Sequence, residues 1–511
     1  MRLHTIPLAI VAAVAIATPA EAAVRPLKLE FVGRTAALGE ARAEIAGFHK
    51  PTGKLFSTNS DQQQVNVHDL ADPTAPVALT PIDISPYGGG SPTSVAVTNA
   101  CGGRIAVAVP GATETTPGTV EFFSTSGTHL ESVPAGVLPD MLTFAKNGST
   151  LLVANEAQPA TNGSADPEGS VTRVQLLANC TKAPIVTQIK LGGVPLDPGV
   201  RIFGPGSTPA QDLEPEYIAI APDQKTAYVS MQENNAVGVL NLQTRKFTAI
   251  RALGYKDYGL ASNAFDPSDR DGIDLDPFPN VFGMYMPDAL AAYEVGGQTY
   301  VATANEGDAR EYDYFEEEVR VSSSSVVLDP TVFPNAAALK GPNELGRLNI
   351  TRTMGDTDND GDYDKLFTFG GRSTSILDAG GSLVWDSGSF LESWTATNDA
   401  ANFGKSNVAG SPVDDRSDSK GPEPEGVTVG KVAGRQYSFV SNERSGGIFA
   451  FDLEDTPGEA KFAGHINTRE SDLGPEGIAF LAGYQSPTGA PAIIVTNEIS
   501  GTVSIYAVKR K

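Results

Sequence analysis

Acidic residues recur at one position of a repeated phrase in this chain. A short apolar strand opens with an acid in LPDMLTF, EPEYIAI, MPDALAAY, EPEGVTV and GPEGIAF, at Asp140, Glu216, Asp288, Glu425 and Glu476. A second acid closes the next strand in LLVANEA, SMQENN, ATANEGD, SNERS and VTNEIS, at Glu156, Glu233, Glu306, Glu443 and Glu498. A weaker copy begins at Glu44, and another, near Ser94, lacks the acid. Such repetition indicates one supersecondary unit that is copied many times.

The leading acids predict a cation site if the copies bring them together. Several unpaired carboxylates in one funnel are unfavourable unless a cation neutralises them. The alternative is that each acid only caps its own turn by accepting backbone N–H bonds. We predict that Asp140, Glu216, Asp288, Glu425 and Glu476 converge on one face.

The elements that would position these acids are short antiparallel strands. A typical unit has strand-like segments at 216–220, 227–230, 236–240 and 247–250, separated by turn residues. Four such strands are typical of one propeller blade. The sequence therefore predicts an all-β fold, a single β-propeller over residues 24–511, whose first strands line an axial channel.

The number of blades depends on one divergent segment. Residues 346–388 resemble an eighth blade, and the alternative is that they complete the fifth and leave seven blades. The segment Leu27–Gly33 (LKLEFVG) is expected to supply the last strand of the final blade and so close the ring. Insertions at about 307–342 and 393–420 are expected to be polar loops.

The motif GDTDNDGDYDK predicts a calcium loop at residues 356–364. Its alternating acids are Asp356, Asp358, Asp360, Asp362 and Asp364, with Gly361 at the sixth position of the loop. Calcium prefers six to eight oxygen ligands, which this spacing can wrap around one ion. The twelfth position is Phe367, so the motif is not an EF-hand. The alternative is an acidic loop without an ion.

Basic residues occur in the same loops as the acids. Arg310, Arg372 and Arg444 are the candidates for binding a phosphate ester, because the guanidinium fork matches phosphate oxygens. Beside them, Glu216, Asp288, Glu306, Glu425 and Glu476 would hold a metal ion or orient water, as in a phosphoryl-transfer site. The alternative is that each arginine pairs with a neighbouring acid.

Charge and cysteine content restrict the partners and the compartment. The net charge of −24 argues against nucleic acid and against anionic membrane surfaces. Residues 1–22 predict a cleaved signal peptide, with an uncleaved anchor helix as the alternative, and no later stretch could span a bilayer. Cys101 and Cys180 could form one disulfide in an oxidising compartment. Two cysteines and five histidines leave little for zinc, so calcium is the expected cofactor.

The phrases also resemble a known family. EPEYIAIAPDQKTAYVSMQENNAVGVLNL, GDTDNDGDYDKLFTFGGRSTSI and SDSKGPEPEGVTVG are similar to the choice-of-anchor I family over nearly the whole mature chain. The resemblance implies an exported, propeller-like protein. Some members of that family carry alkaline-phosphatase labels, and animal relatives are described as cell-surface glycoproteins. The chain stops at SIYAVKRK without an anchor, which favours a periplasmic or secreted protein. The phrase EPEG is locally similar to β-propeller phytases.

Three functions remain open from the sequence. The preferred hypothesis is a calcium-binding propeller, acting as a metal-dependent phosphoesterase on a small phosphorylated substrate at the acidic mouth of the channel. The first alternative is a non-catalytic propeller that binds a surface ligand. The second alternative is a lactonase-like hydrolase. We expect a monomer in each case.

Overall fold

The computed structural model describes residues 25–39, 42–177, 180–454 and 456–511. The predicted signal peptide, at residues 1–22, lies outside this part of the chain. Strands dominate the described residues, and they are short, with three to nine residues in most of them. Their central members are buried on both faces; for example, all six residues of β8 (Arg104–Val109, RIAVAV) are buried. The sequence prediction of an all-β fold is confirmed.

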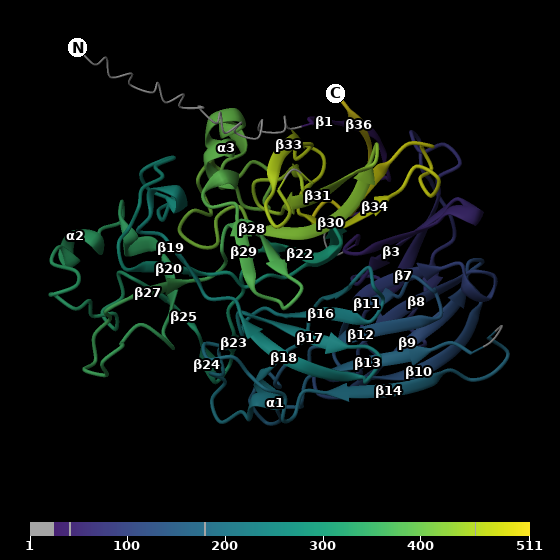
Figure 1. Ribbon diagram of the computed structural model, residues 1–511, viewed down its shortest axis with the longest axis horizontal. Coiled ribbons are helices and arrows are strands. Elements are labelled where there is room, and N and C mark those ends of the chain that lie inside the picture. The colour runs from purple at the N-terminus through teal and green to yellow at the C-terminus, as the bar shows by residue number, and fades with distance from the viewer. Residues whose placement is uncertain (1–24, 40–41, 178–179, 455) are drawn as a thin grey trace, which may run out of the picture.

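Seven sheets of four or more strands follow one another along the described chain (Figure 1). Each is antiparallel and begins at its inner strand. In chain order, the first three consist of β2 (Ala46–His49), β3 (Lys54–Asn59), β4 (Gln64–Asp69), β5 (Val77–Ala78) and β6 (Ile82–Asp83); of β7 (Ser94–Thr98), β8, β9 (Pro117–Ser124) and β10 (His129–Val137); and of β11 (Pro139–Phe144), β12 (Thr150–Asn155), β13 (Ser170–Gln175) and β14 (Ile185–Lys190).

The remaining four sheets keep this pattern. They consist of β15 (Ile218–Ile220), β16 (Thr226–Met231), β17 (Ala236–Asn241) and β18 (Lys246–Ala252); of β21 (Leu290–Val295), β22 (Gln298–Asn305), β28 (Ser373–Asp378) and β29 (Leu383–Asp386); of β30 (Pro424–Val432), β31 (Arg435–Asn442), β32 (Ile448–Asp452) and β33 (Lys461–Ile466); and of β34 (Pro475–Leu481), β35 (Ala492–Asn497), β36 (Thr502–Arg510) and β1 (Leu27–Arg34).

The segment 346–388 does not form a sheet of its own. Strand β28 pairs with β22 and then with β29, so this segment completes the fifth sheet. The interpretation as an eighth blade is therefore wrong for this segment. The reason is that β22 and β28 are separated by a long insertion, and a pattern of local alternation does not reveal which distant strand a segment will join.

The two ends of the described chain meet in the seventh sheet. Strand β1 pairs antiparallel with β36, from Leu27 opposite Arg510 to Arg34 opposite Ser504. This is the pairing that we predicted for the N-terminal strand. The first strands also contact one another in succession, from β2 through β7, β11, β15, β21, β30 and β34 back to β2. The inner strands therefore surround a common centre.

Glycines in the inner strands allow this close approach. A Cβ atom on Gly426 would lie 2.2 Å from the backbone oxygen of Glu476, and one on Gly477 would lie 2.5 Å from that of Glu44. Both distances are too short for any side chain, which explains the glycine after the acid in EPEG and GPEG. The hydrophobic core lies between neighbouring sheets; one cluster joins Leu152 of β12 to Val229 of β16.

Two connecting segments, one between β18 and β21 and one between β22 and β28, share a core and lie beside the fifth sheet (Figure 1). They include a sheet of β19 (Tyr255–Asp257), β20 (Val281–Met284) and β27 (Leu366–Thr368), and two hairpin-like pairs, β23 (Glu311–Tyr312) with β24 (Phe315–Glu316) and β25 (Glu318–Arg320) with β26 (Asn349–Thr351). The helices are α1 (Pro209–Asp212), α2 (Ala336–Leu339) and α3 (Phe390–Asn398). The insertions expected as polar loops therefore contain short strands and helices.

Cys101 and Cys180 form a disulfide, as the sequence suggested, with their Cα atoms 5.7 Å apart. Cys101 follows β7, and Cys180 lies between β13 and β14, so the bond joins the second and third sheets. Both cysteines have positive φ angles, in turns at the sheet ends. The disulfide thus connects two sheets that also share a hydrophobic core.

Candidate cation-binding sites at the inner strands

Carboxylates from five sheets line one cavity of about 150 Å³ at the inner strands. The acids are Glu44, Asp140, Asp288, Glu425 and Glu476. We call this space the axial cavity. The predicted convergence is confirmed for Asp140, Asp288, Glu425 and Glu476. Glu216 does not line the cavity, although its neighbour Tyr217 does. Glu44 was not chosen as a site residue, although its phrase EIAGFH carried the same leading acid.

The axial cavity holds its acids in an environment that opposes their ionisation. Burial raises the pKa of Asp140 to about 6 and that of Glu44 to about 7. Burial, followed by neighbouring carboxylates, raises the pKa values of Asp288, Glu425 and Glu476 well above their usual range. One buried carboxylate oxygen of Glu476 has no hydrogen-bond partner among the described residues. At about 30 Å³ for each water, the cavity has room for one cation with a few waters.

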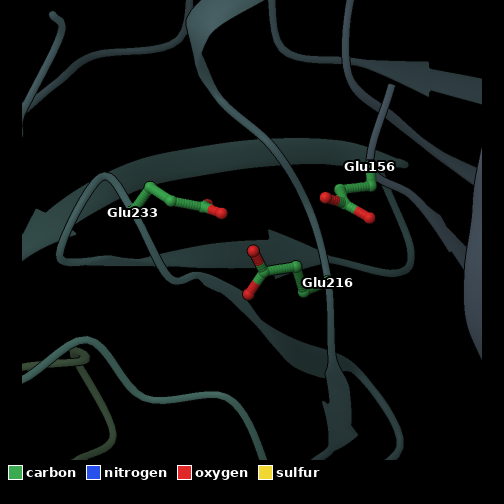
Figure 2. Close-up of side chains that lie close together, drawn as sticks. All are labelled: Glu156, Glu216 and Glu233. Atoms are coloured by element: carbon green, nitrogen blue, oxygen red, sulfur yellow. The ribbon is translucent and has the colours of Figure 1, made fainter. Parts of the chain in front are cut away.

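Glu216 belongs to a different group, which we call the first trio: Glu156, Glu216 and Glu233. Their side chains point toward one another (Figure 2), and one oxygen from each lies within 4.8 Å of the others. Glu156 follows β12, Glu216 precedes β15 and Glu233 follows β16, so the trio lies between the third and fourth sheets. The three residues are only 8%, 6% and 4% exposed, respectively.

An equivalent group lies between the fifth and sixth sheets, and we call it the second trio: Glu306, Glu425 and Glu443. Glu306 follows β22, Glu425 lies at the start of β30 and Glu443 follows β31. One oxygen from each again lies within 4.8 Å of the others. Both trios therefore combine the closing acid of one repeat with the leading and closing acids of the next.

Basic side chains contact the second trio. Lys420 Nζ lies 2.8 Å from Oε1 of Glu306, and Arg444 Nε lies 3.2 Å from Oε2 of Glu443. The buried Glu423 also pairs with both cations, at 3.7 Å from Lys420 and 2.9 Å from Arg444. Burial alone would raise the pKa of Glu423, but Lys420, Arg416 and Arg444 lower it to about 2.

Two of the three predicted ester-binding arginines are buried in ion pairs. Arg310, with a side chain 2% exposed, pairs with Asp212 and, at 3.1 Å, with Glu214. Arg372 is 0% exposed and lies 3.0 Å from Glu392. Neither arginine lines the axial cavity. This placement matches the alternative, pairing with neighbouring acids. The side chain of Arg444 is 24% exposed.

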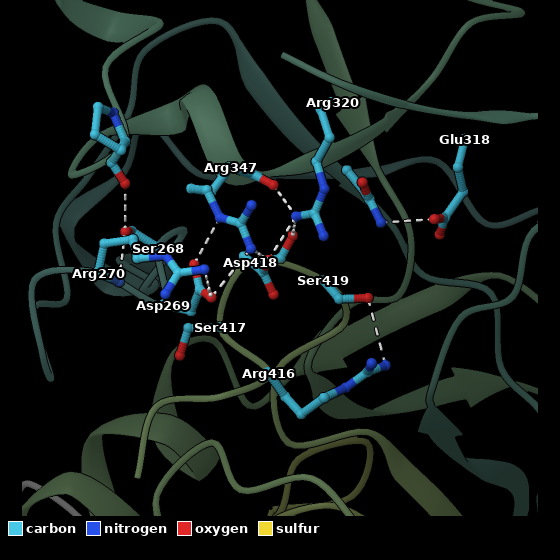
Figure 3. Close-up of polar contacts among 12 residues, drawn as sticks. Ser268, Asp269, Arg270, Glu318, Arg320, Arg347, Arg416, Ser417, Asp418 and Ser419 are labelled. Carbon is cyan, nitrogen blue, oxygen red and sulfur yellow. Dashed lines mark hydrogen bonds and ion pairs between the residues drawn. The ribbon is translucent and has the colours of Figure 1, made fainter. Parts of the chain in front are cut away.

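The buried Arg372 instead anchors the segment that carries Lys420. Its Nη2 donates to the backbone oxygens of Ser417 and Ser419, at 2.7 and 2.8 Å. Asp418, between them, accepts from Arg320 at 2.6 Å and from Arg347 at 2.9 Å (Figure 3). Because both ends of this turn are fixed by arginines, Lys420 is held in position over the second trio.

The acids of the predicted calcium loop form two groups. Oxygens of Asp356, Asp358 and Asp360 lie within 4.8 Å of one another at the exposed surface, whereas Asp362 and Asp364 lie with Asp329. Asp329 precedes the loop by 27 positions, and the motif gave no sign of it. Asp356 accepts hydrogen bonds from the backbone N–H groups of residues 359, 360 and 361. These bonds close a tight turn in the loop, and its acids are divided between two groups.

A model of the choice-of-anchor I domain matches residues 44–456 of this chain. The chain belongs to the choice-of-anchor I family. Membership of this family indicates an exported protein. Within the described residues, no helix has both the length and the apolar composition needed to cross a membrane.

Two curated relatives match parts of the chain. Gigasin-3a of Magallana gigas is 34% identical over 188 residues, which cover 32% of this chain and 65% of that protein. The mesenchyme-specific cell surface glycoprotein of Strongylocentrotus purpuratus is 29% identical over 350 residues, covering 61% of this chain and 42% of the relative. The matched region therefore spans less than two thirds of either relative.

Three solved structures resemble the chain with TM-scores below 0.5. Hydrazine synthase of Kuenenia stuttgartiensis has a TM-score of 0.46 and 11% identity, with coverage of 92% of this chain and 96% of that one. The Cps50 (Swd1) β-propeller domain of Myceliophteria thermophila has a TM-score of 0.44 and 9% identity, covering 94% and 99%. Streptogramin B lyase has a TM-score of 0.44 and 10% identity, covering 95% and 98%. The likeness concerns the fold alone.

Proposed function

We propose that this protein is an exported, seven-bladed β-propeller, closed by β1, that binds calcium in the axial cavity. The observation that carries the proposal is the meeting of Glu44, Asp140, Asp288, Glu425 and Glu476, from five sheets, around about 150 Å³. Carboxylate oxygens are the ligands that calcium prefers. A periplasmic or secreted location would supply calcium, and the disulfide fits an oxidising compartment.

A cation offsets the main electrostatic cost of this arrangement. The acids of the cavity repel one another, and burial raises the pKa values of all five. A bound divalent cation would favour their ionised forms and join five sheets at their inner edge. On this proposal the ion is structural, and the protein is a binding module whose loops contact a surface ligand.

A metal-dependent phosphoesterase is the second candidate, and the second trio favours it. Glu425 lines the axial cavity and also belongs to the second trio, beside Lys420 and Arg444. An ion in the cavity and these two cations could together stabilise the charge on a phosphate ester. In this candidate Arg444 and Lys420 take the ester-binding role that we first expected of Arg310 and Arg372.

Calcium binding tests the proposal directly. The purified protein would be freed of metal with a chelator and titrated with calcium by isothermal calorimetry, beside a Glu476→Gln variant. We expect the variant to lose one bound calcium per chain and to keep its circular dichroism spectrum. Glu294→Gln is the matched control, since Glu294 is an exposed acid on β21. Equal stoichiometry in the wild type and Glu476→Gln would refute the cavity as a calcium site.

An activity assay separates the two candidates. Hydrolysis of an aryl phosphate, phytate and a lactone would be measured with calcium and with chelator. Phosphate release that requires calcium and decreases in Arg444→Met would support the phosphoesterase. Turnover of the lactone alone would favour a lactonase. A protein that binds calcium and turns over none of these substrates is the expected result for a binding module.

A further inference from the structure

We propose that the first trio, Glu156, Glu216 and Glu233, is a second divalent-cation site, separate from the axial cavity. None of the three residues lines that cavity. The inference goes beyond the proposed function, because this site lies between the third and fourth sheets and shares no residue with the axial cavity. Its natural ligands are a hard cation such as calcium, magnesium or manganese, since all three side chains offer oxygen.

The geometry of the trio fits such an ion. The three oxygens lie within 4.8 Å of one another and come from three different chain segments (Figure 2). With calcium–oxygen bonds of about 2.3 to 2.6 Å, two oxygens on opposite sides of one ion are roughly 4.6 to 5.2 Å apart. An ion placed among the carboxylates would therefore require little movement of the backbone.

Two buried oxygens in this group lack a protein partner. One carboxylate oxygen of Glu216 and one of Glu233 have no hydrogen-bond partner among the described residues, although both side chains are more than nine-tenths buried. Glu156 accepts one hydrogen bond, from the side chain of Gln158. Leaving buried charged oxygens without partners is costly, and cation binding is one of the few arrangements that removes this cost.

The basic residues nearest to the trio are already engaged with other acids. Arg310 pairs with both Asp212 and Glu214, so one positive charge serves two carboxylates. Arg201 pairs with Glu317, and toward Glu233 it donates only to the backbone oxygen. The trio thus carries three acids for which these arginines provide no direct ion pair.

The second trio shows how the same arrangement is neutralised within the protein. There, Lys420 and Arg444 directly contact Glu306 and Glu443. Because the two trios occupy equivalent positions of the repeat, an external cation at the first trio would take the place that Lys420 and Arg444 occupy at the second.

The site also has an approach from the surface. A surface depression of about 340 Å³ is lined by Glu233 of the trio, by Gln158, which contacts Glu156, by the exposed Asp308 and by Arg310. Within this depression Arg310 pairs with Asp212 and Glu214, and Asp308 lies 3.5 Å from Lys420. This depression and the axial cavity share no lining residue, so the two sites can be altered separately.

The test uses Glu156→Gln and Glu233→Gln in the full-length protein, with Glu476→Gln and Glu294→Gln beside them. Chelated protein would be incubated with calcium, magnesium or manganese, desalted, and analysed for metal per chain. We expect each trio variant to bind one ion fewer than the wild type. The double variant Glu156→Gln/Glu476→Gln should bind two fewer, because the two sites share no residue.

Thermal unfolding gives a second measurement. If the glutamates only stabilised the fold, their substitution would lower the melting temperature with or without metal. In chelator, Glu156→Gln and Glu233→Gln should unfold at a higher temperature than the wild type, since a buried charge has been removed. With metal present, their order relative to the wild type should reverse. The proposal would be overturned if both trio variants bound as much metal as the wild type with all three cations. It would also be overturned if both variants were less stable than the wild type in chelator.

Discussion

The first and second trios are built from the same repeat positions but differ in what surrounds them. Each combines three glutamates at the boundary between neighbouring sheets, with oxygens within 4.8 Å of one another. The second trio directly contacts Lys420 and Arg444, whereas the arginines nearest to the first are paired with other acids. The repeat therefore determines where acids gather, and residues outside the repeat determine how their charge is balanced.

The difference can be traced to one insertion. Lys420 lies between α3 and β30, in a segment that Arg372 holds through Ser417 and Ser419. Arg320 and Arg347 hold the same segment through Asp418 (Figure 3). The segment between β14 and β15, which leads to Glu216, carries α1 instead, and its Asp212 pairs with Arg310. An insertion in one repeat thus brings a lysine, and an insertion in another brings a further acid.

Lys420→Met should break this comparison and have the largest effect. Removing the lysine leaves the buried Glu423 and the second trio short of a cation, and loss of one partner of a buried ion pair costs about 3–5 kcal/mol. In chelator, urea denaturation should therefore measure an unfolding free energy that is lower than that of the wild type by this amount. Calcium should restore part of it, and metal analysis should find one additional ion per chain. Unchanged stability would contradict the role given to Lys420.

The pH dependence of the chelated protein should show the two kinds of acid separately. Glu44 and Asp140 have pKa values of about 7 and 6 because they are buried, above the usual values of 4.5 and 3.8. The folded state therefore binds more protons than the unfolded state between about pH 4 and 7, and stability falls as the pH rises through this range.

Glu423 has the opposite effect on the pH dependence of stability. Its pKa of about 2 lies below the usual value of 4.5, so its contribution to stability is present above about pH 4.5 and is lost as the pH falls toward 2.

Because Glu44 and Asp140 dominate at higher pH, the melting temperature of the chelated protein should decrease between pH 5 and pH 8. Calcium should raise the melting temperature more at pH 8 than at pH 5. A melting temperature in chelator that rises from pH 5 to pH 8 would contradict this assignment.

Gln158→Lys should make the first trio resemble the second. The side chain of Gln158 already contacts Glu156, so a lysine there can place an ammonium group beside the trio. In chelator we expect a melting temperature a few degrees higher, because each kcal/mol of added stability shifts the melting temperature of a larger domain by about 2–4 °C. The variant should also bind one ion fewer than the wild type. Gln64→Lys is a control, since Gln64 lies on β4 outside both trios. An unchanged metal content in Gln158→Lys would argue against an ion at the trio.

Asp358→Asn should have the smallest effect. Asp358 is exposed in the loop 356–364. Partial loss of hydration, followed by the neighbouring acids, raises its pKa above the usual value. In chelator we expect no measurable change in melting temperature, as for most surface substitutions. Calcium-dependent protection of the loop from proteolysis should be lost in this variant but retained in Gln243→Asn, a substitution in an exposed turn.

Much of the fold followed from local patterns. The alternation of apolar and polar residues predicted the short strands, and the phrase LKLEFVG predicted the strand that pairs with β36. The repeated position of the acids predicted that Asp140, Asp288, Glu425 and Glu476 would meet. These predictions succeeded because a copied unit places its residues in equivalent positions, whatever the details of its loops.

Other features could not be predicted in this way. The fifth sheet takes β28 from beyond an insertion, and pairing at that distance has no local signal. Arg310 and Arg372 have the composition of ligand-binding residues, yet the fold buries both against acids. The first trio joins closing and leading acids of neighbouring repeats, which could have been found by placing consecutive repeats side by side.

The sequence by itself determined the repeat, the strand content, the cysteine pair and the recurrence of an acid at all but one of the inner strands. These are properties of short segments, and period-two alternation and turn residues specify them locally. Only the tertiary structure decided which acids share a site and which of them a lysine or arginine neutralises. That outcome depends on distances between side chains of different sheets, because electrostatic interactions follow separation in space and burial, not position along the chain.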